Sequence, residues 1–169
     1  VRHPIIRESL SSLCATENQI EIVTLADIPS GTGLGSSGSF TTALCKALCV
    51  HNRGHISTEE LAELSFYIEI NKLNEPIGKQ DQYIAAYGGI CSFEFKKNGK
   101  VKVSSLNLKK HTVYELEDNL LLFFTGFTRQ AGVILKDQKS KTQTDNQAML
   151  ENLHHTKRIG IESKNAIEN

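Results

Sequence analysis

The spacing of apolar and polar residues predicts a chain of mixed helices and strands. Apolar positions recur at helical spacing in some segments, while shorter segments alternate or stay apolar as strands do. The segments with helical spacing are 37–50, 57–71, 80–87 and 144–169. The segments with strand patterns are 19–25, 90–95, 101–106 and the apolar run 119–126, which suits a buried strand.

Short local signals indicate where these elements begin and end. Ser57 followed by Glu60 forms a capping-box pattern at the start of a helix. Pro76 interrupts that helix because proline cannot continue its hydrogen bonds. The turn at 97–100 joins two strand patterns into a hairpin. On the helix from residue 37 the expected buried face carries Phe40, Ala43, Leu44, Ala47 and Leu48. The whole pattern predicts an α+β fold with segregated helices and hairpin-containing sheet.

Composition narrows the classes of function. The chain has 169 residues, enough for one domain or a large part of one, and 39% of them are hydrophobic. Its 19 basic and 19 acidic residues balance, so it lacks the positive charge that drives nucleic-acid binding. No apolar run reaches the roughly 18 residues of a membrane span, and the start shows no signal-peptide pattern. We therefore expect a cytoplasmic protein with small-molecule partners and without nucleic-acid or membrane partners.

The cysteines and histidines predict no metal site. The four cysteines form no CxxC pair, so we expect reduced thiols packed in the interior. His51 and His55 are four residues apart, but the sequence NRG between them breaks a helix that would align them. The chain begins at Val1 and ends within an expected helix, which leads us to expect a part of a larger protein.

The segment SGTGLGSSGSF, residues 30–40, places four glycines and four serines directly before a helix. It matches GxGxxG in form, but ADIPSGT separates that match from the preceding strand, unlike a dinucleotide-binding turn. A Walker A loop requires a lysine that this segment lacks, and a plain linker would not lead straight into a helix. A helix start attracts anions through unpaired N–H groups and its dipole, and glycines let the backbone approach them closely. The segment therefore predicts a polyphosphate-binding loop.

Three motifs carry a resemblance to a known family. PSGTGLGSS, residues 29–37, resembles the second motif of the GHMP kinases, the relatives of galactokinase, homoserine kinase, mevalonate kinase and phosphomevalonate kinase. GKQDQY, residues 78–83, resembles the segment of sugar kinases in this superfamily whose aspartate faces the phosphate acceptor. Glu69 lies twelve positions before Asp81, where these kinases carry a magnesium-binding glutamate.

The resemblance is greatest to the D-glycero-D-manno-heptose 7-phosphate kinases, through GKQDQYIAAYGG and the later FTGFTR at 124–129. Fucokinase-type domains share much of this pattern. The superfamily's N-terminal and C-terminal motifs have no counterpart here, so the chain resembles the middle of a member, about half its usual length. Residues 1–169 then correspond to the central part of the N-terminal ATP-binding domain, with the start of a C-terminal helical segment near 144–169.

The resemblance implies a fold, a reaction and cofactors. The implied fold is the ribosomal protein S5 domain 2-like α+β fold. The implied activity is an ATP- and Mg²⁺-dependent sugar kinase, which phosphorylates the anomeric hydroxyl of heptose 7-phosphate for lipopolysaccharide or capsule biosynthesis. A fucokinase-like or other GHMP small-molecule kinase is an alternative, and so is a non-catalytic sugar or nucleotide sensor on the same fold. The isolated segment is expected to be inactive if the rest of the domain is required, and its oligomeric state stays open.

The resemblance also implies roles for individual residues. Asp81 is the catalytic group that orients or deprotonates the sugar hydroxyl; the alternative is an acid that stabilises the start of a helix. Ser37 and Glu69 bind magnesium; the alternatives are an N-cap serine and a salt bridge to a lysine. The nucleotide-binding loop comprises Ser30, Gly31, Thr32, Gly33, Leu34, Gly35, Ser36 and Ser37. The candidate substrate contacts are Lys79, Gln82 and Arg129.

Overall fold

The computed structural model describes the chain except residues 14–18, 29–30, 124–130, 145 and 169. The described contacts divide it into two compact units, one of residues 1–88 and 128–135, the other of residues 89–127 and 136–169. In chain order the elements are α1 (Pro4–Ser12), α2 (Ser36–His51), α3 (Thr58–Phe66), the π-helix η1 (Tyr67–Lys72), α4 (Gln80–Tyr87), β1 (Cys91–Phe95), β2 (Val101–Ser105), α5 (Lys110–Asp118), α6 (Ala131–Gln143) and α7 (Gln147–Glu168).

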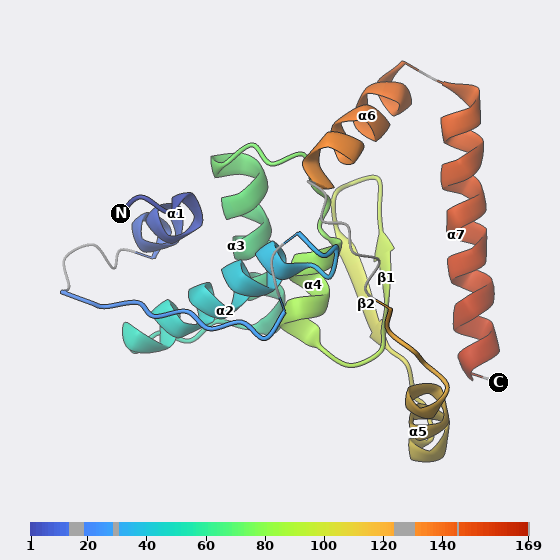
Figure 1. Ribbon diagram of the computed structural model, residues 1–169, viewed down its shortest axis with the longest axis horizontal. Helices are drawn as coiled ribbons and strands as arrows, with labels where there is room; N and C mark the ends of the chain where they lie inside the picture. The colour runs from blue at the N-terminus through green and yellow to red at the C-terminus, as the bar shows by residue number, and fades with distance from the viewer. Residues whose placement is uncertain (14–18, 29–30, 124–130, 145, 169) are drawn as a thin grey trace. The chain divides into compact units, whose positions relative to one another are not determined.

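Helix α2 organises the first unit by packing against α1, α3 and α4 (Figure 1). Its Leu44 and Leu48 meet Leu10 of α1 in one apolar cluster. On another side, Cys45 joins Leu61 and Ile68 in a second cluster. The predicted helix is therefore confirmed, and its apolar spacing is what joins it to its neighbours.

The buried face of α2 is rotated from the predicted one. Ala43 and Ala47 are exposed, whereas Thr41 and Thr42 are buried. The reason is that α2 is contacted on several sides, which brings small polar residues into the interior. The Thr41 hydroxyl is satisfied there because it donates to the carbonyl of Ser37 at 2.9 Å.

The next two helices lie where the sequence predicts them. Helix α3 begins with the capping box, since the Ser57 side chain accepts from the Glu60 amide and the Glu60 carboxylate accepts from the Ser57 amide. Its continuation widens into η1, so the predicted helix to residue 71 exists with a π-helical end. Helix α4 ends before Gly88, whose positive φ of 65° suits glycine.

The second unit contains the predicted hairpin and C-terminal helix. Strands β1 and β2 pair antiparallel with Phe93 opposite Val103, and the Lys96 amide donates to the Lys100 carbonyl across the turn. Helix α7 confirms the expected helical end of the chain. Helix α5 lies in a stretch for which no element is predicted from the sequence. No described residue of α5 or α7 is buried.

Two predicted strands are wrong over the described residues. The segment 19–25 forms no strand, and its Leu25 is 96% exposed. In the run 119–126, residues 120–123 are exposed and form no strand, and residues 124–126 lie outside the described residues. An apolar pattern becomes a strand only where a neighbouring backbone supplies hydrogen bonds, and the described part of the chain has one sheet, β1 with β2.

The helices and hairpin agree with the α+β class, while the ribosomal protein S5 domain 2-like classification stays a prediction. None of the described helices combines the length and the apolar character needed to cross a bilayer.

Candidate active site

The glycine-rich loop has the backbone that the sequence predicts for it. Gly31, Gly33 and Gly35 all have positive φ, at 79°, 81° and 68°. Gly35 is the N-cap of α2, and no side chain caps this helix start. The first N–H groups of α2 therefore have no partner within the helix and form an anion-attracting end. A Cβ atom at Gly33 would meet nothing within 4 Å, so the loop is open on that side.

The serines of the loop lie at the first turn of α2. Ser36 is the first residue of the helix and Ser37 the second, and the Ser37 side chain is exposed. The alternative that Ser37 is the N-cap is wrong, because Gly35 holds that position in a left-handed conformation. Thr32 is half-buried and Leu34 exposed, while Ser30 lies outside the described residues.

Asp81 lies directly against the start of α2. A Cβ atom added at Gly35 would be 3.2 Å from Cγ of Asp81, and one added at Gly38 would be 2.8 Å from its Cβ. The second distance is shorter than real Cβ atoms tolerate, so only glycine permits this approach. The structure thus joins two motifs that are more than forty positions apart in the sequence.

The role of Gly38 is missed when the sequence is read alone. Glycine within a helix costs about 1 kcal/mol relative to alanine. That cost is a signal that a glycine in the first turn of a predicted helix is needed for a close contact. Here the contact is with the backbone carbonyl carbon of Asp81, 3.0 Å from the added Cβ, and with the amide nitrogen of Gln82, 3.2 Å from it.

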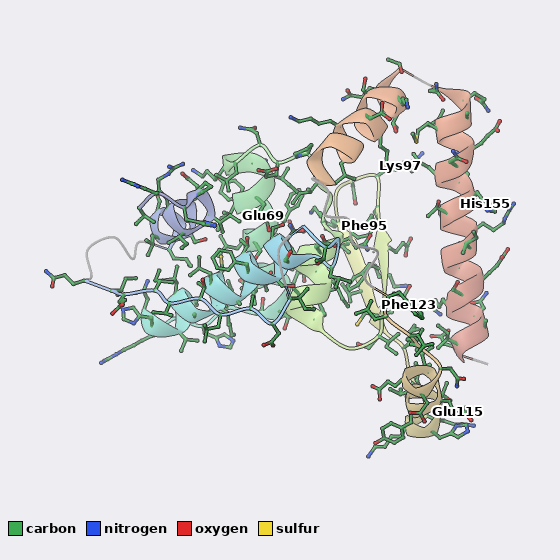
Figure 2. The ribbon with its side chains drawn as sticks, viewed as in Figure 1. Glu69, Phe95, Lys97, Glu115, Phe123 and His155 are labelled. Carbon is green, nitrogen blue, oxygen red and sulfur yellow. The ribbon has the colours of Figure 1, made fainter. Side chains whose placement is uncertain are left out.

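Glu69 is a buried carboxylate on the π-helix η1 (Figure 2). Its residue is 1% exposed, and its Oε1 accepts a hydrogen bond from Nε2 of Gln82 at 3.0 Å. Within the described residues no lysine or arginine pairs with it. The predicted alternative of a lysine salt bridge is therefore not what the structure shows. π-Helical turns are rare and are often found at functional sites.

The surroundings of Glu69 fit a divalent cation. Glu69 is 1% exposed and has one described side-chain donor, the neutral amide of Gln82, and holding an ionised carboxylate in such a place requires a compensating cation. Mg²⁺ prefers oxygen ligands and is commonly held by one or two carboxylates together with substrate phosphates. The described residues include no group of three or more acidic, histidine or cysteine side chains that could hold a metal ion, so a cation beside Glu69 would need further ligands, such as substrate phosphates.

Gln82 and Lys79 already have protein partners. Gln82 is fully buried, and its Oε1 has no hydrogen-bond partner among the described groups. Lys79 Nζ lies 2.6 Å from Oε1 of Glu63 and 4.5 Å from the ring centre of Phe66. Arg129, the third candidate substrate contact, lies outside the described residues.

Glu63 links Lys79 to Tyr83, whose hydroxyl also donates to Oε1 of Glu63. Partial burial favours a raised pKa for Glu63, but the hydrogen bonds and the charge of Lys79 outweigh it, so the pKa lies below its ordinary value. The pKa of Tyr83 is raised, first by burial and then by its hydrogen bond to Glu63. The carboxylate is therefore ionised and the phenol protonated around neutral pH.

Two of the four cysteines agree with the expectation of packed thiols, while Cys91 on β1 is only half-buried. Cys45 and Cys49 are buried and form no disulfide. Burial raises the pKa of the Cys45 thiol, against the lowering effect of its contacts with Ser9 and Ser65. Cys14 lies outside the described residues.

Known proteins are similar to this chain in sequence and fold. Residues 5–89 match the N-terminal domain of the GHMP kinases. The chain belongs to the GHMP kinase family. It is 35% identical over 144 residues to the D-glycero-alpha-D-manno-heptose 7-phosphate kinase of Campylobacter jejuni subsp. jejuni serotype O:2, covering 85% of this chain and 42% of that one.

Two further relatives are also sugar kinases. The bifunctional fucokinase/GDP-fucose pyrophosphorylase of Arabidopsis thaliana is 34% identical over 119 residues, covering 69% of this chain and 11% of that protein. The crystal structure of a D-glycero-D-manno-heptose 1-phosphate kinase from Bacteriodes thetaiotaomicron superposes with a TM-score of 0.74 at 29% identity, covering 98% of this chain and 48% of the other. The chain thus spans less than half the length of these relatives.

Proposed function

We propose that the protein is an ATP- and Mg²⁺-dependent sugar kinase that phosphorylates the anomeric hydroxyl of D-glycero-D-manno-heptose 7-phosphate. The observation that carries this proposal is the placement of the Asp81 carboxyl group beside Gly35, at the start of α2. If the terminal phosphate of ATP binds at this helix start, a carboxylate there would be next to the acceptor hydroxyl, which supports a catalytic role for Asp81. Sugar kinases among the relatives support the reaction class.

The loop from Ser30 to Ser37 would hold the phosphates of ATP. Positive φ values recur at every second residue, Gly31, Gly33 and Gly35, and turns with alternating backbone conformations of this kind form concave arrangements of N–H groups that bind anions. The N–H groups at the start of α2 add the positive end of the helix dipole. Phosphoryl transfer depends mainly on positioning and charge stabilisation, which this loop would supply through its backbone.

Asp81 would act on the sugar. It would orient the anomeric hydroxyl and take its proton while the sugar oxygen attacks the γ-phosphorus atom of ATP. The bond between that phosphorus and the β,γ-bridging oxygen breaks, and ADP leaves. Glu69 and the Ser37 hydroxyl would hold Mg²⁺, which neutralises charge on the phosphates.

The three candidate substrate contacts have different roles in this proposal. Arg129 is kept as a contact for the anionic sugar phosphate. The pairing of Lys79 with Glu63 and the burial of Gln82 against Glu69 favour supporting roles for these two. Gln82 would orient the Glu69 carboxylate, so that the motif carrying Asp81 also helps to build the metal site.

A fucokinase-like activity is the second candidate, because the Arabidopsis thaliana relative over 69% of this chain is named as a fucokinase. A sugar or nucleotide sensor without turnover is the third. A sensor needs neither an acceptor carboxylate at the phosphate loop nor a buried metal-binding glutamate, so Asp81 and Glu69 favour an enzyme.

The test is turnover by the full-length protein with MgATP against a panel of sugars. The panel contains heptose 7-phosphate, fucose, galactose and mannose, with ³¹P NMR to locate the new phosphate. We expect a 1,7-bisphosphate from heptose 7-phosphate. Exclusive formation of fucose 1-phosphate would show that the protein has the second candidate activity, that of a fucokinase. ATP binding without transfer to any sugar would overturn the proposal of a kinase.

A further inference from the structure

We propose that Glu63 is a positioning residue for Asp81, holding the first turn of α4 so that the Asp81 carboxylate stays at the start of α2. This inference rests on the proposed function of Asp81. Glu63 belongs to α3 and forms no described hydrogen bond with Asp81 or with the glycine-rich loop. It would act on the chemistry only through the residues that it binds.

The contacts of Glu63 bracket Asp81 in the sequence. Lys79, the N-cap of α4, lies two residues before Asp81, and Tyr83 lies two residues after it. Both side chains reach the same oxygen, Oε1 of Glu63. One carboxylate therefore holds the backbone on either side of the proposed catalytic group.

Helix α4 needs such an anchor because it is short. It has eight residues and no side-chain cap at its start. Isolated helices of this length are not stable in water, so tertiary contacts determine where its first turn lies. The packing of Phe66 against the Lys79 ammonium adds to the attachment of α4 to α3.

The first turn of α4 is held on three sides. Lys79 and Tyr83 reach Glu63 on α3, Gln82 reaches Glu69 on η1, and Asp81 touches Gly35 and Gly38 on α2. The contacts with α2 are close approaches without a described hydrogen bond. The described polar contacts of this turn are therefore those with Glu63 and Glu69, and the two contacts of Glu63 lie on either side of Asp81.

The test compares Glu63→Gln with Glu59→Gln in the full-length protein. Both variants remove one negative charge from α3, near Tyr83. Glu59 is exposed and acts on Tyr83 only through its charge, which contributes to raising the pKa of Tyr83, whereas Glu63 binds Tyr83 and Lys79 directly. Glu63→Gln should lower kcat about 10- to 100-fold, because small misplacements of catalytic groups cost that much. Its KM for ATP should stay within about twofold, because the phosphate loop is on another helix. Glu59→Gln should leave kcat and KM unchanged.

Tyr83→Phe provides a milder second variant that keeps the ion pair between Glu63 and Lys79. Its kcat should fall by a smaller factor, and combining it with Glu63→Gln should add little further loss. Hydrogen exchange should be faster at residues 80–83 in Glu63→Gln and unchanged at residues 36–40. If both variants reduce kcat no more than Glu59→Gln does, Glu63 does not position Asp81.

The outcomes separate this inference from the proposed function. Loss of activity in Asp81→Asn together with full activity in Glu63→Gln overturns only the positioning role. A fully active Asp81→Asn overturns the proposed function, and with it the positioning role. A fall in kcat with unaltered exchange at 80–83 would also contradict the role, because Asp81 would then not have been released.

Discussion

The two units differ in what they bury. In the first unit the interior includes polar and charged side chains, with Glu69 and Gln82 at its centre. In the second unit no described side chain is buried, and apolar residues such as Leu121 and Leu122 are about 80% exposed. Burying a carboxylate costs free energy that an apolar residue would not cost. The comparison shows that polar and charged side chains are buried in the first unit and not in the described part of the second.

The ion pairs of the two units support the same distinction. On α7 the pairs Arg158–Glu162 and Lys164–Glu168 are spaced four residues apart on one helix. Such surface pairs contribute about 0.3–0.5 kcal/mol each. The pair of Lys79 with Glu63 instead joins two helices next to the proposed catalytic residue. We therefore expect loss of this ion pair to lower kcat more than it lowers the free energy of unfolding.

The largest effect is expected for Asp81→Asn. The amide keeps the size of the side chain but loses its charge and basicity, so kcat for sugar phosphorylation should fall by at least about 100-fold. ATP affinity and melting temperature should stay nearly unchanged. The matched control is Asp118→Asn on α5 in the second unit, where the carboxylate is exposed. Equal kcat values for Asp81→Asn and Asp118→Asn would show that a carboxylate of the first unit matters no more for catalysis than one of the second.

Glu69→Gln should weaken magnesium activation. Loss of a carboxylate ligand should raise the Mg²⁺ concentration needed for half-maximal rate by at least about 10- to 100-fold. Changing a residue that only hydrogen-bonds to a metal ligand already has an effect of that size. Without metal the variant should keep nearly the wild-type stability, because the glutamine carbonyl can still accept the hydrogen bond from Gln82. Thermal shifts with and without MgATP measure both effects. An unchanged Mg²⁺ dependence would show that Glu69 is structural.

Alanine at two glycines should have opposite effects in the two units. Gly38→Ala should destabilise the protein by about 1–3 kcal/mol, because its Cβ would overlap Asp81. Gly160→Ala on α7 meets nothing within 4 Å and should stabilise its helix by up to about 1 kcal/mol. Urea unfolding of both variants gives the comparison. Stabilisation by Gly38→Ala would refute the close approach of α2 and α4.

The smallest effect is expected from pH. The folded-state pKa of Glu63 lies below its ordinary value of 4.5, so its stabilising contribution is complete above about pH 4.5. That contribution is lost as the pH falls through the folded pKa. The stability difference between wild type and Glu63→Gln should thus be largest near neutral pH and shrink below pH 4.5. Urea midpoints between pH 3 and pH 7 measure it, and a difference that grows on acidification would contradict the shift.

The sequence predicts the local features of this protein well. The capping box at Ser57, the hairpin turn and the positive φ values of the loop glycines all follow from residue chemistry over a few positions. The strand predicted at 19–25 fails because pairing depends on a partner that local sequence does not reveal. The prediction of the buried face of α2 is partly wrong for a similar reason, since the helix is contacted from several sides.

The residues of the candidate site can be predicted from the sequence, but the contacts between them cannot. The motifs indicate Asp81 and the glycine-rich loop, and only the structure shows the two in contact through Gly35 and Gly38. The partners Glu63 and Gln82 are not predictable in these roles, because hydrogen bonds between helices depend on the packing of α3, η1 and α4.

The central claim is that nucleotide phosphates bind at the start of α2, beside Asp81, with Mg²⁺ held by Glu69. The most direct test is a crystal structure of the full-length protein with Mg²⁺ and a non-hydrolysable ATP analogue. We predict phosphate oxygens within hydrogen-bonding distance of amides in residues 31–37, and Mg²⁺ bound by Glu69. The Asp81 carboxylate should face the terminal phosphate. A nucleotide bound away from the start of α2, or Mg²⁺ bound without Glu69, would contradict the account.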